Sequence, residues 1–289
     1  VVAIVGDGLR SATTHARRFH VRNALPGETV KARLLRKRKG TRFGDGVAVI
    51  DAPHLDRAVP MCSYFPRCGG CALQHMSYDF QLRHKESQVR HALGQWAIEP
   101  ENWAQPVSTG QYSYRRKARL GVRVVGGEVL VGFRESFSNR VARMQQCETL
   151  TAKLSQLIEP LREVIAGLSQ PDKVPQIELA QGDSAVVIIV RHLNDMSASD
   201  VQLWSKFADH YVAEVLSQSG GYDSVRGLTG AAVMKLHYQL ESLRMEFDPR
   251  QFTQVNADMN ARLIATAIDY LEPLTKKEII DLFCGIGNF

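Results

Sequence analysis

The sequence lacks any uninterrupted apolar run long enough to span a membrane as a helix. It also lacks the charged start, apolar stretch and cleavage site of a secretory signal. We find no internal repeat and no low-complexity tract. The 289 residues, 44% hydrophobic and 23% charged, have the composition of an ordinary globular protein with room for two or three domains. These features indicate a cytoplasmic protein with no membrane partner, and no obligate protein partner is evident.

Cysteine is scarce and odd in number, which argues against a disulfide framework in a chain without an export signal. Three of the five follow the spacing Cys-x5-Cys-x2-Cys, at Cys62, Cys68 and Cys71, and Cys147 and Cys284 stand alone. This grouping indicates a bound metal. Thiolates suit both iron–sulfur clusters and zinc. The spacing therefore leaves three interpretations open: a cluster, a zinc ion, or buried cysteines without a ligand.

Positive charge is concentrated in two segments. Residues 1–54 hold eleven Lys or Arg against four Asp or Glu, a net charge of +7. The other 235 residues carry a net charge of −1, which gives +6 for the chain. Residues 111–143 hold eight Lys or Arg against two Glu. Clustered cations favour a polyanion, because they release counterions from phosphates. The alternative is a basic face that only water contacts.

The first 54 residues read as short strands separated by turn signals. Strands are predicted at 1–5, 29–35 and 46–50, and the turns contain Pro26-Gly27 and Asp45-Gly46. The segment is small, basic and rich in strand-forming residues. It therefore predicts a compact β-barrel.

The central part alternates helical and strand patterns after a loop. Residues 53–75 follow neither period and contain the three grouped cysteines, which predicts a loop wrapped around a ligand. The spacing of apolar residues predicts helices at 78–96, 151–168 and 200–217. It predicts strands at 118–125, 128–133, 177–179, 185–190, 233–238 and 243–247. An α+β domain follows from this order.

The last forty residues change character. A helix is predicted at 256–271 and a hydrophobic strand at 278–283, followed by the glycine-rich run 284–289. A strand that leads into such a turn opens many nucleotide-binding α/β domains. One helix and one strand would each expose an apolar face. We therefore expect the sequence to stop inside that domain.

Six segments, in order along nearly the whole chain, resemble the 23S ribosomal RNA (uracil-5)-methyltransferases. They are 62–75, 114–120, 131–134, 146–147, 249–256 and 281–289. The resemblance implies a 4Fe-4S cluster, and so iron rather than zinc, held by Cys62, Cys68, Cys71 and Cys147. Residues 23–28 are also similar to part of a TRAM domain, an RNA-binding β-barrel, although residues 11–16 depart from that pattern.

The same resemblance implies roles for single residues. Gln254, Phe283 and Asn288 would contact S-adenosylmethionine, and Phe252 would stack near the target base. The alternative for Phe252 is an aromatic residue of the core. Basic side chains of the two cationic segments would contact the RNA: Lys37, Lys39, Arg115, Arg116 and Arg119.

The chemistry of this family needs two residues that we do not find in the chain. A cysteine thiolate adds to C6 of uracil, and C5 then takes the methyl group from the sulfonium. A carboxylate removes the C5 proton, and the thiolate leaves C6. The resemblance places both residues beyond position 289, and it assigns Cys284 to the cofactor loop. We therefore name no catalytic residue and expect residues 1–289 alone to be inactive.

The sequence thus predicts a multidomain protein. Its expected parts are a TRAM-like β-barrel at 1–54, a cluster-bearing α+β domain at 55–248, and the start of a Rossmann-like α/β methyltransferase domain at 249–289. The expected function is methylation of uridine C5 in 23S ribosomal RNA, with the 1939-type site favoured by the TRAM segment. The alternative is a non-catalytic RNA-binding module that holds an iron–sulfur cluster or zinc.

Overall fold

The computed structural model describes residues 2–5, 9–14, 17–35, 37, 40–273, 275 and 278–288. The chain is a mixed α/β protein with several sheets and divides into two compact units. The first unit comprises Val1–Pro106 and Arg134–Ala142, and the second comprises Val107–Phe133 and Arg143–Phe289. Among the described residues, no helix has both the length and the apolar character needed to cross a membrane.

A five-stranded sheet forms the N-terminal part of the first unit, with the strand order β1-β2-β3-β5-β4. Its strands are β1 (Val2–Val5), β2 (Leu9–Thr14), β3 (Arg17–Arg22), β4 (Val30–Leu34) and β5 (Phe43–Val49). Strands β3 and β5 are parallel, and the other pairs are antiparallel. Phe19, Val21 and Ala24 form a small core on this sheet. The closure of the sheet into a barrel stays a prediction.

The grouped cysteines lie in the loop that follows this sheet. The described residues 53–77 form no helix and no strand, as predicted. Helix α1 (Tyr78–Gly94) begins after the loop, where the Ser77 side chain accepts a hydrogen bond from the Phe80 amide. The predicted helix at 78–96 is therefore confirmed to within two residues.

The segment Arg134–Ala142 departs from the second unit and packs within the first. The Gly69 amide donates to the Arg134 carbonyl at 2.9 Å, and the Ser136 amide donates to the Arg67 carbonyl at 3.0 Å. The Phe137 ring lies 4.8 Å from the Phe43 ring of β5, measured between centroids. This segment therefore holds the cysteine loop on one side and the five-stranded sheet on the other.

A six-stranded sheet organises the second unit, with the order β11-β10-β9-β8-β6-β7. Its strands are β6 (Lys117–Val125), β7 (Glu128–Gly132), β8 (Gln176–Gln181), β9 (Val186–Arg191), β10 (Ala213–Gln218) and β11 (Val225–Gly227). Short 3-10 turns, η1 (Pro171–Lys173) and η2 (Tyr222–Ser224), precede β8 and β11. Only the β9–β10 pair is parallel.

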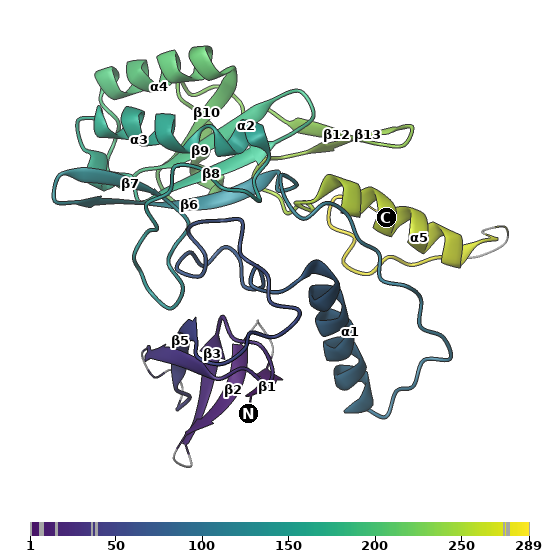
Figure 1. The fold of residues 1–289 in the computed structure, drawn as a ribbon. Helices are drawn as coiled ribbons and strands as arrows, with labels where there is room; N and C mark the ends of the chain where they lie inside the picture. Colours follow the sequence, from purple (N-terminus) through teal and green to yellow (C-terminus); the bar gives the residue numbers. More distant parts are fainter. Residues whose placement is uncertain are drawn as a thin grey trace. The chain divides into compact units, whose positions relative to one another are not determined.

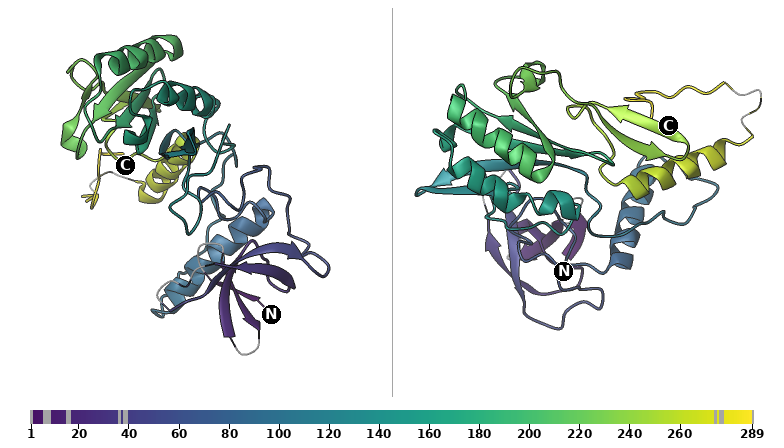
Figure 2. Two further views of the ribbon diagram at one scale, coloured as in Figure 1. Left: turned by 90° about the vertical axis from the view of Figure 1, so that its left-hand side faces the viewer. Right: turned by 90° about the horizontal axis from the view of Figure 1, so that it is seen from above.

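Helices cover one face of this sheet, and a hairpin shares a core with three of its strands. Helices α3 (Ile158–Ala166) and α4 (Ala198–Tyr211) lie side by side on one face, with the short α2 (Ala152–Ser155) before them (Figure 1, Figure 2). Apolar residues recur every three or four positions along α3, at Ile158, Leu161 and Ile165, and all three are fully buried. The hairpin of β12 (Leu236–Leu240) and β13 (Leu243–Phe247) joins a second core with residues of β8, β9 and β10.

Two predicted elements were wrong in part. The predicted helix at 200–217 ends at Tyr211, and Ala213–Gln218 forms strand β10. Val212 adopts φ +50°, which ends the helix, and the following residues pair with β9. The predicted helix at 151–168 is divided into α2 and α3.

The predicted strand at 278–283 was also wrong. These described residues form turns and irregular structure, downstream of α5 (Ala257–Leu271). A strand exists only where a neighbour satisfies its backbone hydrogen bonds. No described strand pairs with residues 278–288, so the apolar run has no partner that would make it a strand.

Candidate cofactor, RNA and metal sites

A tight turn introduces the segment that contains Phe252 and Gln254. The Gln251 amide donates to the Asp248 carbonyl at 2.9 Å, and the Asp248 amide donates to the Gln251 side chain at 2.9 Å. Arg250 forms a bidentate ion pair with the Asp248 carboxylate, and its hydrogen bonds hold the pKa of Asp248 below the ordinary value. Phe252 follows this turn with 77% of its surface exposed. It is therefore a surface aromatic residue and not part of the core.

The far end of the same segment caps helix α5. The Asn256 side chain accepts from the Met259 amide at 3.0 Å and donates to Thr109 Oγ1 at 3.0 Å. The backbone amide of Arg116 donates to the Val255 carbonyl at 2.9 Å. These contacts fix the end of the segment against the start of β6 and leave residues 252–254 between two anchored points.

The glycine-rich run 284–288 forms a turn whose backbone requires glycine. Gly285 and Gly287 have φ values of +62° and +73°, a region that other residues seldom adopt. The Gly287 amide donates to the Cys284 carbonyl at 3.0 Å. Ile286 packs against the second core of the unit, which attaches this turn to the hairpin side of the sheet.

Asn288, next to that turn, belongs to a hydrogen-bonded cluster. Its amide exchanges two hydrogen bonds with the buried Asn260 of α5, at 2.7 and 3.0 Å. The Tyr238 hydroxyl from β12 donates to Asn288 Oδ1 at 2.6 Å. Burial raises the pKa of Tyr238, so the hydroxyl keeps its proton at neutral pH. The side-chain oxygen of Asn288 thus accepts from both Asn260 and Tyr238, and its side-chain nitrogen donates to Asn260.

One cavity of about 470 Å³ brings these parts together. Its lining includes all three residues predicted to contact the cofactor, Gln254, Phe283 and Asn288, and also Phe252. Tyr238 of β12 lines it as well, and sequence reasoning missed this residue because no motif contains it. A volume of this size and a mixed lining suit a ligand of nucleoside size.

The basic residues of the β6 region contact partners within the second unit. Arg116 forms an ion pair with Asp183 at 2.6 Å, and Arg119 forms one with Glu178 at 3.1 Å and contacts the Tyr222 hydroxyl. The Arg115 guanidinium lies over the Phe133 ring, 5.5 Å from its centroid. The positive charges of Arg116 and Arg119 are therefore partly balanced, and the contact of all three arginines with RNA stays a prediction.

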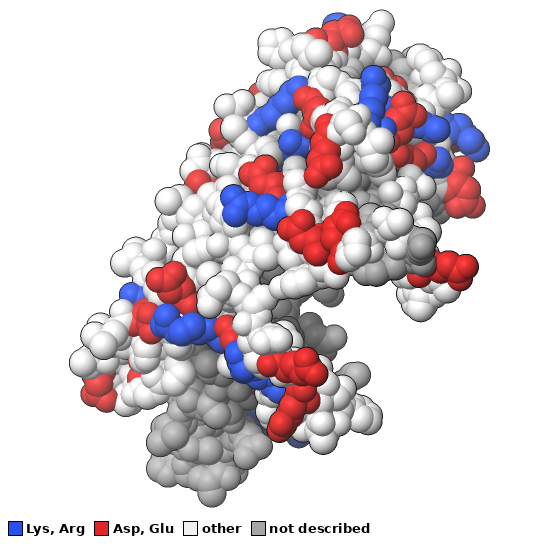
Figure 3. Space-filling view, turned by 90° about the vertical axis from the view of Figure 1, so that its right-hand side faces the viewer, with Lys and Arg blue, Asp and Glu red and all other residues white. Residues whose placement is uncertain are grey.

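The N-terminal basic run is only partly described. Lys37 is exposed, and Lys39 lies outside the described residues. On the face of the protein shown in Figure 3, Lys and Arg side chains are interspersed with Asp and Glu. The contribution of Lys37 and Lys39 to RNA binding stays a prediction.

Three of the four predicted cluster ligands lie in one loop of the first unit. Cys62 and Cys68 are buried and Cys71 is half-buried. The Gly70 amide donates to Cys68 Sγ at 3.4 Å, the kind of contact that stabilises a thiolate bound to iron. The Cys62 amide donates to the Gln74 side chain at 3.2 Å. Thiolates with an amide contact suit either an iron–sulfur cluster or zinc, so the cluster stays a prediction.

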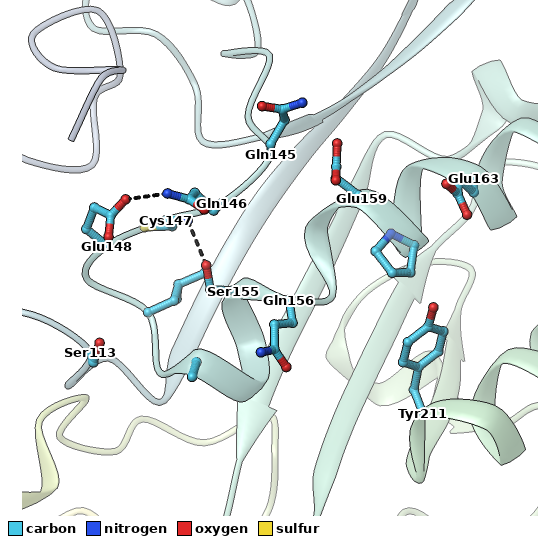
Figure 4. A pocket seen from close by; sticks show the side chains of 13 residues that line it. Ser113, Gln145, Gln146, Cys147, Glu148, Ser155, Gln156, Glu159, Glu163 and Tyr211 are labelled. Atoms are coloured by element: carbon cyan, nitrogen blue, oxygen red, sulfur yellow. Dashed lines mark hydrogen bonds between the residues drawn. The ribbon is translucent and has the colours of Figure 1, made fainter.

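Cys147, the fourth predicted ligand, lies in the second unit and lines a cavity of about 640 Å³ (Figure 4). Its amide donates to Ser155 Oγ at 2.8 Å, and its sulfur lies 3.3 Å from Thr149 Oγ1. Figure 4 also shows Glu148, Glu159 and Glu163 around this cavity. Across the described part of the chain, no three His, Cys, Asp or Glu side chains converge tightly enough to hold a metal ion.

Curated relatives match the chain along nearly its whole length. It is 37% identical to the 23S rRNA (uracil(1939)-C(5))-methyltransferase RlmD of Acinetobacter baylyi, over 96% of the chain and 61% of the relative. It is 38% identical to the RlmD of Nitrosococcus oceani, over 100% of the chain and 65% of the relative. The chain thus spans somewhat less than two thirds of these relatives. No protein-family model matches it.

A solved structure shares the fold. It is the tRNA (uracil-54, C5)-methyltransferase of Pyrococcus abyssi in complex with S-adenosyl-L-homocysteine, with a TM-score of 0.71 and 19% identity. The similarity covers 100% of this chain and 68% of that protein. At this level of identity the comparison establishes the architecture.

Proposed function

Because this chain is a homologue of the RlmD 23S rRNA (uracil-C5)-methyltransferases, we propose that the full-length protein methylates C5 of uridine 1939 in 23S ribosomal RNA. The match of 37–38% identity over 96–100% of the chain carries this proposal. The cavity that holds Gln254, Phe283 and Asn288 supports it, because a methyltransferase needs one pocket for its cofactor beside an exposed site for the base.

In this proposal S-adenosylmethionine occupies the 470 Å³ cavity and supplies the methyl group. Asn288 offers one N–H to an acceptor of the cofactor, since its other polar positions are taken by Asn260 and Tyr238. Gln254 and Phe283 line the same cavity and would contact the cofactor from two further segments. Cys284 belongs to the turn of this cavity and has no proposed catalytic role.

Phe252 is proposed to stack on the target uracil. Its ring is largely exposed and borders the cofactor cavity, so a stacked base would lie beside the methyl donor. Stacking on an aromatic ring stabilises an unpaired base by about 1–3 kcal/mol. A uridine held in this way would be excluded from its usual stacking in the RNA and presented to the cofactor.

A 4Fe-4S cluster held by Cys62, Cys68, Cys71 and Cys147 completes the proposal. Its role would be structural, because methyl transfer from a sulfonium needs no electron transfer. Residues 1–54 would form the TRAM-like barrel, 55–248 the central domain and 249–289 the start of the methyltransferase domain. The RNA would contact Lys37, Lys39, Arg115, Arg116 and Arg119. The enzyme would act in the cytoplasm, where 23S ribosomal RNA is modified.

The proposal is tested by incubating the full-length protein with methyl-labelled S-adenosylmethionine and 23S ribosomal RNA that lacks the modification. Digestion of the RNA to nucleosides should release labelled 5-methyluridine, and fragment mapping should place it at position 1939. Label in any other nucleoside would contradict the reaction, and label at another uridine would contradict only the position. RNA binding without transfer would favour the non-catalytic RNA-binding module instead.

A further inference from the structure

Lys117, the first residue of β6, donates a hydrogen bond to the turn that precedes Phe252. Its ammonium nitrogen lies 2.5 Å from the carbonyl oxygen of Gln251. The carboxylates of Glu178 and Asp248 attract this ammonium group. Burial nevertheless lowers the pKa of Lys117, and the positive charge of Arg119 lowers it further.

The Lys117 contact anchors the upstream end of the segment that carries Phe252, together with the hydrogen bond from Arg250 to the Tyr222 carbonyl. At the other end, the Arg116 amide donates to the Val255 carbonyl, and Asn256 caps helix α5. The contacts with Gln251 and Val255 come from two adjacent residues, Lys117 at the start of β6 and Arg116 just before it. Phe252 lies between them, and 77% of its surface is exposed. The position of the ring therefore depends on the backbone that these contacts fix.

We propose that Lys117 is a positioning residue that holds the Phe252 ring in the orientation in which it stacks on the target base. This role rests on the proposed function, because it assumes that Phe252 contacts the base. Without the ammonium group, the Gln251 carbonyl loses the partner that ties the turn to β6. The turn would keep the hydrogen bond from Arg250 to the Tyr222 carbonyl but lose its tie to β6, and the ring would sample several orientations. Stacking would weaken, because a mobile ring loses conformational freedom each time it binds the base.

The surroundings of Lys117 explain why this contact persists. The Asp248 carboxylate is itself fixed by Arg250, and Glu178 is buried on β8 opposite Arg119. These fixed negative charges compensate the ammonium group for its partial loss of water. Lys117 therefore acts within the protein, whereas its neighbours Arg116 and Arg119 were expected to face the RNA.

The test is a double-mutant cycle on the full-length protein. Lys117→Met, Phe252→Ala and the double variant are compared for binding to a fluorescein-labelled RNA fragment of 23S ribosomal RNA that spans position 1939. Lys117→Met should weaken binding about fivefold in the wild-type background and less than twofold in the Phe252→Ala background. Lys235→Met removes one exposed positive charge from the same unit and controls for general electrostatics. It should change the affinity by less than twofold.

The outcomes separate this role from the proposed function. An equal loss in both backgrounds would show that Lys117 acts independently of Phe252 and would overturn the positioning role. If Phe252→Ala weakens binding while Lys117→Met does not, the positioning role is overturned and the proposed function stands. If Phe252→Ala leaves the affinity unchanged, stacking by Phe252 fails, and the role of Lys117 fails with it. Lys117→Gln, which keeps a shorter donor, replaces Lys117→Met in the cycle if that variant does not fold.

Discussion

A buried carboxylate joins the five-stranded sheet to the loop that leads to the cysteines. Glu28 is 3% exposed and accepts two hydrogen bonds of 2.6 Å from the Arg57 guanidinium. It also accepts from the amides of Leu25 and His54. Burial alone would raise the pKa of Glu28, but these hydrogen bonds and the charge of Arg57 outweigh it and lower the pKa from 4.5 to about 2. The ionised form is therefore the one that stabilises the fold.

This pair predicts a pH dependence with a definite sign. The folded-state pKa of Glu28 is depressed, so its contribution is complete above about pH 4.5 and is lost as the pH falls towards 2. The difference of about 2.5 pKa units corresponds to about 3 kcal/mol of unfolding free energy. Denaturant unfolding at a series of pH values should show this loss in the wild type. Glu28→Gln should be less stable at pH 7 and should lack this part of the dependence; an unchanged slope would contradict the assignment.

Helices and strands whose hydrophobic period is long and unbroken could be predicted from the sequence. Helix α1, the β6–β7 hairpin and helix α5 all lie where apolar spacing placed them. The errors arose where pairing decides the structure. Residues 213–218 continue a plausible helical pattern but become β10 because β9 offers a parallel partner. Residues 278–283 have the composition of a strand, yet no described strand pairs with them. The composition of a segment does not show whether a neighbouring strand is available to pair with it.

The cysteine loop contacts segment Arg134–Ala142 so closely at Gly69 that we expect even an alanine there to destabilise the protein. A Cβ atom at Gly69 would lie 2.8 Å from the Arg134 carbonyl oxygen, closer than such atoms approach. Gly69→Ala should therefore lower the unfolding free energy of the protein by about 1–3 kcal/mol. Gly94→Ala is the matched control in the same unit, because a Cβ there would meet nothing within 4 Å. Thermal unfolding of the two variants should differ, and equal midpoints would contradict the close approach.

At the scale of the whole molecule, the cluster assignment predicts metal content. The full-length protein purified without oxygen should be brown and contain about four iron atoms per chain. Replacing any one of Cys62, Cys68, Cys71 or Cys147 by serine should lower the iron content sharply, because each supplies a thiolate. Cys284→Ser should leave the iron content unchanged, since Cys284 lies outside the ligand set. Metal analysis that finds one zinc and no iron would contradict the cluster.

The candidate cofactor site could be predicted only in part from the sequence. The resemblance identified Gln254, Phe283 and Asn288, and the structure places all three on one cavity. The resemblance did not identify Tyr238 or Asn260, which orient Asn288 through side-chain hydrogen bonds. These residues come from a distant hairpin and from the buried face of α5. Their relation to Asn288 depends on tertiary packing, which no local pattern records.

We propose that the cavity beside Phe252 holds S-adenosylmethionine, although the cavity at Cys147 is larger. Photocrosslinking tests this directly. The full-length protein is irradiated with methyl-labelled S-adenosylmethionine, digested with a protease, and the labelled peptides are identified by mass spectrometry. We predict label in peptides that contain residues 251–256 or 281–288, with loss of the label when excess S-adenosylhomocysteine competes. Competable label confined to the peptides around Cys147, or to any other segment, would contradict the account.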